Sequence, residues 1–271
     1  MDALAARAAA VDGHDPLNEE ARLTRDAGAR HLLSWHGDHL VGYLTHSPGH
    51  GTAQVVVDPQ QRRRRIGSDL VATLADEDAV ALWAFGDIPA ARGFAAHLGL
   101  SAARALLVMG RDLPAGLPVS TTDPAVTLRG FAPADAHALI AVNAAAFAHH
   151  PEQGGLDAAG LAARVAEDWF DPEGLIVAVE GDRMLGFHWT KRNVDGTGEV
   201  YVLGVHPAAQ GRGLGRRLLV AGLDHLSRVG SRRVILYVDS ADSVAVQMYE
   251  SAGFGIVHRD VLYRPAPQEL P

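Results

Sequence analysis

A glycine-rich loop between an apolar run and a helical pattern is the segment best suited to bind phosphate. Residues 200–205 are apolar, residues 210–215 hold three glycines, and apolar residues then recur at helical spacing. Glycines at a strand-to-helix junction let backbone N–H groups turn toward one space with no Cβ in the way. The helix N-terminus adds about half a positive charge, and Arg212, Arg216 and Arg217 add mobile charge. The loop therefore predicts a polyphosphate site.

Two other phosphate-binding loops do not fit this segment. A Walker loop ends in Gly-Lys-Ser/Thr, whereas Gly215 is followed by Arg216. A dinucleotide fingerprint needs a further glycine where this chain again has Arg216. An ordinary Gly-rich turn before a surface helix stays open as an alternative. The apolar face expected for that helix consists of Leu214, Leu218, Gly222, Leu226 and Val229.

Length and composition limit the class of protein. A chain of 271 residues suits about two domains. It is 48% hydrophobic and 21% charged, which is typical of a globular protein. A net charge of −8 argues against a nucleic-acid partner. The absence of cysteine excludes disulfides, thiolate metal sites and a thiol nucleophile.

The same inspection gives no membrane or metal signal. No apolar run reaches the roughly 18 residues of a membrane span, and the first residues lack the basic region of a signal peptide. The 14 histidines show no ligand spacing. We therefore expect a cytoplasmic monomer that binds no metal, no membrane and no nucleic acid.

The chain carries one pattern of elements twice. A hairpin is expected at residues 31–36 and 39–46, and a second at 175–180 and 184–191. After each hairpin come a strand, a loop, a helix, a strand, a helix and a strand. The later strands of the first copy correspond to those of the second: residues 55–57 to 203–205, 80–85 to 233–239, and 105–109 to 257–263.

A Pro-rich linker at residues 113–124 separates the two copies. The predicted domains are residues 1–112 and 125–271. Each is expected to be of the α/β class, with a mixed, mostly antiparallel sheet flanked by helices. A repeat of this length indicates gene duplication rather than a solenoid.

The two copies differ in the residues that could do chemistry. Arg65 stands where the second copy has Gly213, so a side chain occupies the place where the backbone should approach a phosphate. Glu199 aligns with Gly51, and Tyr249 with Ala95. The second copy therefore keeps a carboxylate and a phenol that the first lacks, which favours an enzyme with one active domain.

A carboxylate and a phenol suit acyl transfer from a thioester to an amine. Glu199 can remove a proton from the ammonium, the N–H of Val205 can bind the acyl oxygen, and Tyr249 can protonate the leaving thiolate. The ordinary phenol pKa of about 10 is close to that of a thiol. Glu199 could equally be a solvated carboxylate at the start of a strand, and Tyr249 a core aromatic.

The motif Gln-x-x-Gly-x-Gly at residues 210–215, after a Val-His-Pro strand end, resembles the GCN5-related N-acetyltransferases (GNAT). Further segments resemble the mycothiol synthase family, whose members are tandem GNAT enzymes; these are residues 149–155, 169–172, 186–191, 199–206 and 236–238. That family acetylates the cysteine amine of Cys-GlcN-Ins (desacetylmycothiol) with acetyl-CoA. The resemblance implies two tandem GNAT domains, with catalysis in the second.

The resemblance also implies a set of site residues. Substrate contacts would come from Glu19, Glu152, Lys191, Glu199 and Tyr237, and Tyr249 would be the general acid. The acetyl-CoA site of the second domain would comprise Leu203, Gly204, Val205, Gln210, Gly211, Arg212, Gly213, Leu214, Gly215, Arg216, Asp242, Ser243, Val244, Ala245, Val246 and Gln247. A degenerate site in the first domain would comprise Val55, Val56, Val57, Arg63, Arg64, Arg65, Ile66, Gly67 and Ser68.

Alternatives stay open for several of these residues. Lys191 could be an edge-strand lysine, and Glu152 an acid in the first turn of a helix. Asp242 stands where the family has Asn; it would cap a helix equally well, but its charge would face the cofactor. The chain could also acetylate another primary amine, in an aminoglycoside or a peptide, or be a non-catalytic acetyl-CoA sensor.

Overall fold

The computed structural model describes the chain except residues 19–20, 23–27, 76–79, 114–122, 149–150 and 267–271. The chain divides into two compact units, and neither is one continuous stretch of sequence. Unit 1 comprises Met1–Leu107, Asp239–Ala241 and His258–Pro271, and unit 2 comprises Val108–Val238 and Asp242–Val257.

Unit 2 is built on a sheet with the strand order β5-β10-β9-β8-β7-β6. Neighbouring strands from β6 to β9 run antiparallel, whereas β9 and β10 run parallel. The sheet is therefore mixed and mostly antiparallel, as predicted. Its strands are β6 (Thr127–Gly130), β7 (Leu175–Glu180), β8 (Arg183–Arg192), β9 (Gly198–Val205), β10 (Arg233–Asp239) and the last part of β5 (Leu100–Asp112).

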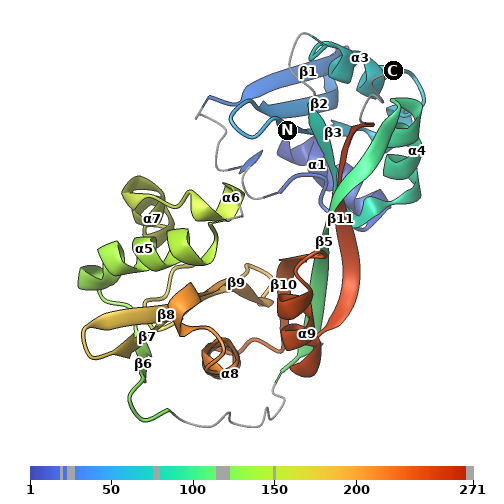
Figure 1. The fold of residues 1–271 in the computed structure, drawn as a ribbon. Helices are drawn as coiled ribbons and strands as arrows, with labels where there is room; N and C mark the ends of the chain where they lie inside the picture. Colours follow the sequence, from blue (N-terminus) through green and yellow to red (C-terminus); the bar gives the residue numbers. More distant parts are fainter. Residues whose placement is uncertain (19–20, 23–27, 76–79, 114–122, 149–150, 267–271) are drawn as a thin grey trace. The chain divides into compact units, whose positions relative to one another are not determined.

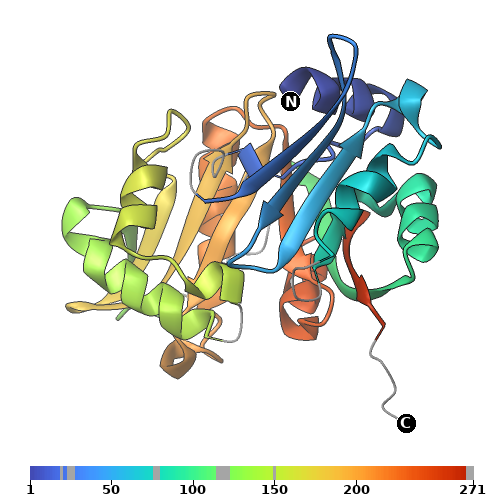
Figure 2. The same ribbon diagram turned by 90° about the horizontal axis from the view of Figure 1, so that it is seen from above.

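Helices cover both faces of this sheet (Figure 1). On one face, Leu139 and Leu161 pack in one core with Phe187 and Trp189 of β8; Figure 2 shows α5, in green, lying across the strands. On the other face, Leu218 packs against β7 and β8. The helices are α5 (Ala136–Ala146), α6 (Pro151–Gly154), α7 (Ala158–Val165), α8 (Leu214–Arg228) and α9 (Ser243–Ser251).

The predicted apolar face of α8 is correct except at its end. Val229 is 40% exposed, because the helix stops at Arg228 and Val229 is its C-cap. Gly222 is required for packing, since a Cβ there would lie 2.1 Å from the ring of His188. The residues of the face that are buried are Leu214, Leu218, Gly222 and Leu226.

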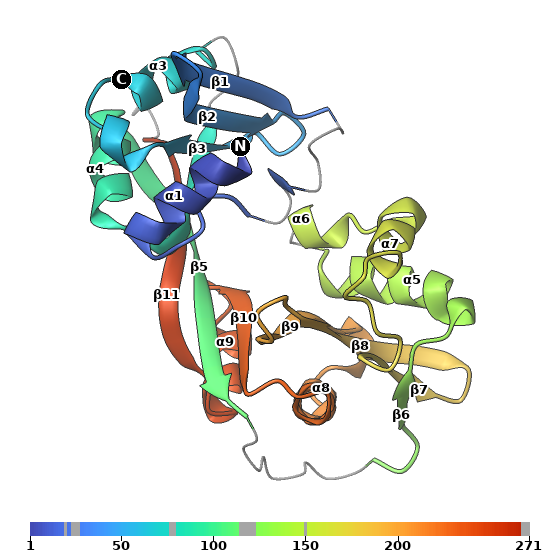
Figure 3. The same cartoon turned by 180° about the vertical axis from the view of Figure 1, so that it is seen from behind.

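Unit 1 has the strand order β1-β2-β3-β4-β11-β5, in which β5 contributes its first part, residues 100–107. The helix α1 (Asp2–Asp12) packs on one face of the sheet, where Leu4 contacts the same core as Tyr43, and Leu70 packs on the other face with Leu44; Figure 3 shows α1 beside the strands. The remaining elements are β1 (Arg30–His36), β2 (His39–Ser47), β3 (Thr52–Val57), β4 (Ala81–Ala84), β11 (Gly255–Pro265), α3 (Ile66–Ala72) and α4 (Pro89–His97).

The final strands of the two repeats are longer than predicted, and each contributes to both units. In β11, Val261 pairs with Ala84 of β4, so a strand from the second repeat completes the sheet of unit 1. In β5, residues 108–112 belong to unit 2, where β5 neighbours β10. The sequence contains no signal for this exchange, because both segments look like ordinary terminal strands.

Candidate active site

The glycine-rich loop of unit 2 has the backbone that its sequence predicts. Gly211 and Gly213 have φ angles of 77° and 72°, in the left-handed region that glycine adopts without steric cost. Gly213 is the N-cap of α8, so the first N–H groups of that helix face the loop without partners inside the helix. This is the geometry by which helix N-termini bind phosphate.

The strand before the loop parts from its parallel neighbour. β9 and β10 pair from Gly198 to Val200, although β9 continues to Val205 and β10 to Asp239. The pairing thus stops while both strands, which lie wholly within the described residues, still have several residues to run. The backbone of β9 beyond Val200 therefore presents hydrogen-bonding groups toward this divergence.

Val205 directs its N–H into that divergence. The N–H of His206 donates to the carbonyl of Leu185 at 2.8 Å, which makes these two opposed residues a hydrogen-bonded pair. Hydrogen-bonded and non-hydrogen-bonded pairs alternate along an antiparallel ladder, so Val205, opposite Gly186, points its N–H and C=O away from β8. Gln210 Nε2 accordingly donates to the Val205 carbonyl at 3.3 Å.

Glu199 lies near the start of β9, on one face of the sheet. It is half-buried, and it is paired with Lys191 of β8 on one side and Ile235 of β10 on the other. The Nδ2 of Asn193 donates to its Oε2 at 3.1 Å. Tyr237, two residues beyond Ile235, lies on the same face by strand periodicity and is 50% exposed. The sheet therefore brings together three of the predicted substrate residues.

Lys191 is held by aromatic rings. Its Nζ lies 4.8 Å from the ring centroid of Trp169 and 5.3 Å from that of Tyr201, both within the range of cation–π attraction. Arg164 donates to the hydroxyl of Tyr201 at 3.1 Å. The edge-strand alternative for Lys191 is wrong, because β8 lies between β7 and β9.

Tyr249 is a buried phenol on α9. Its side chain is 7% exposed, and its ring packs edge-on against Phe254 with centroids 5.7 Å apart. Burial raises the pKa of Tyr249 above its ordinary value, and the charge of Asp242 raises this pKa further. The phenol therefore stays protonated at neutral pH and can act as a proton donor, but it is a weaker acid than its ordinary pKa suggests.

Asp242 caps the helix that carries Tyr249. Its Oδ1 accepts a hydrogen bond from the N–H of Ala245 at 2.9 Å. The carboxylate is thus tied to the first turn of α9, in agreement with the capping role expected from the sequence. The predicted cofactor segment 242–247 is this cap together with the first helical turn.

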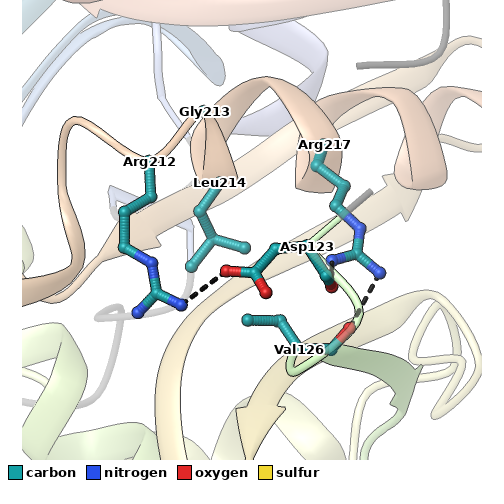
Figure 4. Close-up of a pocket in the computed structure, with 6 residues that line it drawn as sticks. All are labelled: Asp123, Val126, Arg212, Gly213, Leu214 and Arg217. Carbon is teal, nitrogen blue, oxygen red and sulfur yellow. Dashed lines mark hydrogen bonds and ion pairs between the residues drawn. The ribbon is translucent and has the colours of Figure 1, made fainter. Parts of the chain in front are cut away.

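All three arginines that the sequence suggested as mobile charge near the loop donate hydrogen bonds to protein groups. Arg212 donates to Asp123 Oδ2 and to Glu180 Oε1, both at 2.6 Å, and the Glu180 hydrogen bond is the main cause that raises the pKa of Arg212. Arg217 donates to the carbonyls of Asp123 and Val126 at 3.2 and 2.8 Å (Figure 4). These contacts fix the start of the second repeat to α8.

The small pocket they surround is lined by Asp123, Val126, Arg212, Gly213, Leu214 and Arg217. Arg216 donates to Ser251 Oγ at 3.2 Å.

The loop of unit 1 repeats this backbone with different residues. Arg63 and Arg65 have φ angles of 63° and 66°, matching the left-handed angles of Gly211 and Gly213. Like Gly213, Arg65 is the N-cap of its helix, α3. The backbone path is therefore kept although neither residue favours it.

The hydrogen bonds around the unit 1 loop also correspond. Arg62 Nε donates to the carbonyl of Val57 at 3.3 Å, as Gln210 does to Val205. The guanidinium of Arg62 also binds both carboxylate oxygens of Asp12, at 2.8 and 2.5 Å. The arginine that replaces the loop glutamine is therefore neutralised by an acid of α1.

The chemical asymmetry predicted from the alignment persists in three dimensions. Gly51 directly precedes β3 and Ala95 is buried in α4, and neither residue supplies a carboxylate or a phenol. Gly67, the counterpart of Gly215, is tightly packed, since a Cβ there would lie 3.1 Å from the ring of Phe94. At these positions unit 1 offers a backbone loop without the carboxylate and the phenol of unit 2.

Two predicted substrate residues cannot be placed. Glu19 lies outside the described residues, and Glu152 falls in α6, where its side chain is not described. Sequence reasoning missed Asn193, Trp169 and Tyr201. Of these, Tyr201 had a usable signal, because it follows Glu199 by two residues and must share its face of the strand.

The described residues contain no cluster of three or more His, Asp or Glu side chains that could bind a metal ion. Among the helices of these residues, none has both the length and the apolar character needed to cross a bilayer.

Comparison with known proteins assigns the family. Residues 146–254 match the acetyltransferase (GNAT) family. The mycothiol acetyltransferase of Gordonia bronchialis is 46% identical over 94% of this chain and 88% of its own length, and that of Nocardia farcinica is 46% identical over 96% and 91%. The chain belongs to the mycothiol acetyltransferase family. As a member of it, the chain is an acetyl-CoA-dependent N-acetyltransferase that acts on a small molecule.

Solved structures support the fold of this mycothiol acetyltransferase family member. A GCN5-related N-acetyltransferase from Sphaerobacter thermophilus superposes with a TM-score of 0.73 at 24% identity, covering 97% of this chain and 90% of its own. A tandem GNAT protein from the clavulanic acid biosynthesis pathway gives a TM-score of 0.69 at 19% identity, covering 99% and 97%. These structures confirm the predicted tandem GNAT fold. The family relatives, not the fold, exclude the alternative of a non-catalytic acetyl-CoA sensor.

Proposed function

We propose that this chain transfers the acetyl group of acetyl-CoA to the cysteine amine of Cys-GlcN-Ins, and that unit 2 carries the reaction. The observation that carries the proposal is that Glu199, Lys191 and Tyr237 share one face of the sheet beside the divergence of β9 from β10. A family whose members are named mycothiol acetyltransferases supplies the substrate class.

The loop of unit 2 fits the diphosphate of coenzyme A. Left-handed Gly211 and Gly213 remove the side chains that would block it, and the N-terminus of α8 supplies N–H donors. Acetyl-CoA brings the activated acetyl group. The residues that would hold it are Leu203–Val205, Gln210–Arg216 and Asp242–Gln247, with Arg216 the arginine of the loop that binds no carboxylate among the described residues.

We assign the steps of the reaction to three groups of unit 2. Glu199 accepts a proton from the ammonium of the acceptor, either directly or through a water molecule. The N–H of Val205 donates to the acyl oxygen as negative charge develops there. Tyr249, which burial keeps protonated, donates its proton to the departing sulfur.

The acceptor carries many hydroxyl groups, and the proposed contacts match them. The ammonium of Lys191 donates to hydroxyl oxygens, and the carboxylates of Glu19 and Glu152 accept from hydroxyl hydrogens. The exposed ring of Tyr237 lies on the same face. Since aromatic rings hold Lys191 in place, its ammonium is positioned before the acceptor arrives.

For unit 1 we propose a supporting role in a cytoplasmic monomer, in which residues 113–124 divide the two repeats of the sequence. Its loop keeps the backbone of the unit 2 loop and holds four consecutive arginines, Arg62–Arg65, the first of which binds Asp12. A second coenzyme A could be held there by Val55–Val57 and Arg63–Ser68, but without the acid and base it would not react.

The substrate is tested by comparing acceptors. Purified protein and acetyl-CoA would be incubated with Cys-GlcN-Ins, with GlcN-Ins lacking the cysteine, with an aminoglycoside, and with a cysteine-initiated peptide. Products would be identified by mass spectrometry, because the acceptor thiol interferes with thiol reagents. We expect kcat/KM to be highest for Cys-GlcN-Ins. A higher kcat/KM for the peptide or the aminoglycoside would refute the proposed substrate.

The role of Glu199 is tested by Glu199→Gln across a range of pH. An α-amino group has a pKa near 8, so a general base helps most below that pH. We expect a loss of about 10²–10⁴-fold at neutral pH and a smaller loss at high pH, where the amine is already neutral. An equal loss at every pH would assign Glu199 to substrate binding alone.

A further inference from the structure

The carboxylate of Glu199 has a partner to which the proposed reaction gives no role. The amide nitrogen of Asn193 donates to Oε2 of Glu199 at 3.1 Å. Asn193 directly follows β8, whereas Glu199 is the second residue of β9. The hydrogen bond therefore spans the β8–β9 hairpin beside its turn, next to the cross-strand pair of Lys191 and Glu199.

Both backbone polar groups of Asn193, its N–H and its carbonyl, make hydrogen bonds within the turn. Its N–H donates to the carbonyl of Thr197 at 2.8 Å, and its carbonyl accepts from the N–H of Gly196 at 2.9 Å. Asp195 accepts from the N–H and the hydroxyl of Thr197 at 2.9 and 3.1 Å. Gly196 allows the turn because it adopts a φ of 85°. The side chain of Asn193 is therefore presented from a fixed backbone.

A neutral amide donor affects a carboxylate in two ways. It fixes one oxygen, which restricts rotation of the carboxylate plane, and it favours the ionised form over the protonated form. It does both without adding a charge or a titration of its own. An aspartate or a lysine at this position would instead change the charge that faces Glu199.

Other charged residues lie on the elements around Glu199, and a test must distinguish them from Asn193. Lys191 lies opposite it on β8, and Arg233 lies two residues before its partner Ile235 on β10. Arg164 of α7 reaches the same face through Tyr201, and Asp195 lies in the turn. Of these charges, Asp195 shares the turn with Asn193, which makes it the matched control.

We propose that Asn193 is a positioning residue for Glu199, which orients the carboxylate toward the acceptor amine and stabilises its ionised form. The inference rests on the proposed role of Glu199 as the base. It adds to that role a specific residue of the hairpin turn, one that touches neither acetyl-CoA nor the acceptor in the proposed reaction.

The test compares Asn193→Asp, Asn193→Ala and Asp195→Asn. A carboxylate at position 193 disfavours a second charge, so Asn193→Asp should move the acidic limb of the kcat/KM profile up by about one pH unit or more, with activity recovering at high pH. Asn193→Ala should lower kcat several-fold with little change in KM. Asp195→Asn, which leaves the Asn193–Glu199 bond intact, should keep the wild-type profile.

A second readout separates this proposal from the catalytic one. The titration of the Glu199 carboxyl can be followed by ¹³C NMR without substrate, with its signal assigned by its loss in Glu199→Gln. We expect Asn193→Asp to raise this pKa. Titration curves that superimpose for wild type and Asn193→Asp would overturn the positioning role, as would an equal shift in Asp195→Asn. If the activity loss of Glu199→Gln is independent of pH, Glu199 is not the general base. The NMR titration then still tests whether Asn193 affects the pKa of Glu199.

Discussion

The loops before α3 and α8 follow the same backbone path and are made of different residues. In unit 2 the left-handed positions are Gly211 and Gly213, and in unit 1 they are Arg63 and Arg65. The hydrogen bond from residue 210 to the Val205 carbonyl has its counterpart from Arg62 to Val57. Unit 1 therefore keeps the backbone geometry of the loop without the glycines that adopt left-handed angles at no steric cost.

If catalysis belongs to unit 2 as proposed, the comparison shows which parts of a duplicated site are free to change. The packing of α3 and its neighbours fixes the unit 1 loop, so the backbone is maintained even though non-glycine residues in left-handed conformations cost about 1–2 kcal/mol each. Side chains that serve only chemistry are under no such constraint. Unit 1 accordingly has Gly51 and Ala95 where unit 2 has Glu199 and Tyr249.

The largest effect should come from a substitution that blocks the proposed phosphate site of the unit 2 loop. We expect Gly213→Glu to abolish measurable turnover, because the new carboxylate would occupy and repel the phosphate site, whereas Arg65→Glu in the matching position of unit 1 should keep turnover within a few-fold. Calorimetry with coenzyme A and thermal unfolding would separate binding from folding. Equal damage from the two substitutions would contradict the assignment of catalysis to unit 2.

The next effect concerns Tyr249, whose matching position in unit 1 is Ala95. Tyr249→Phe should lower kcat by about 10²–10⁴-fold with little change in coenzyme A affinity. The control is Tyr263→Phe, which removes a hydroxyl that donates to Asp87 at 2.6 Å in unit 1 and should leave kcat unchanged. Residual activity of Tyr249→Phe that vanishes when the unit 1 loop is altered would show that unit 1 also catalyses the reaction.

A moderate effect on stability should follow from removing the partner of Arg62. Asp12 is 12% exposed and accepts two hydrogen bonds from that guanidinium, so Asp12→Ala should destabilise the protein by about 2 kcal/mol. Asp123→Ala removes the more exposed partner of Arg212 and should lower the unfolding temperature less. Thermal unfolding of both variants measures the two losses of stability. A larger loss for Asp123→Ala than for Asp12→Ala would refute the prediction.

The smallest effect should come from restoring a glycine to unit 1. Arg65→Gly should stabilise the protein by up to about 1 kcal/mol, because it relieves a left-handed arginine, and Gly213→Ala should destabilise it by a similar amount. Arg64→Gly is the control, since Arg64 is not left-handed. Arg65→Gly should also raise coenzyme A occupancy of unit 1 without adding turnover. A gain in turnover would show that unit 1 can catalyse the reaction without counterparts of Glu199 and Tyr249.

Much of the fold could be predicted because hydrophobic alternation and turn residues mark strands locally. The strands at 175–180 and 233–239 were located to the residue, and the loop glycines predicted the start of α8. The partners of Arg212 and Arg217 were not predictable, because Asp123 and Glu180 are distant in sequence and no local pattern connects them.

The site was less predictable than the fold for a similar reason. Glu199 and Lys191 could be chosen from their types and from the family resemblance, but the Asn193–Glu199 bond depends on the path of a five-residue turn. The environment of Tyr249 also needed coordinates, because burial and Asp242 shift its pKa away from the ordinary phenol value that the sequence argument used.

The exchange of terminal strands has a consequence for synthesis on the ribosome. β4 of unit 1 pairs with residues 261–263 of β11, which are translated roughly 10–35 seconds later at about 5–20 residues per second. Until then the nascent first repeat has an open sheet edge, of the kind that invites pairing with other chains. The gene therefore cannot be cut at the linker into two self-sufficient halves, and the order of translation makes the first repeat the last to be completed.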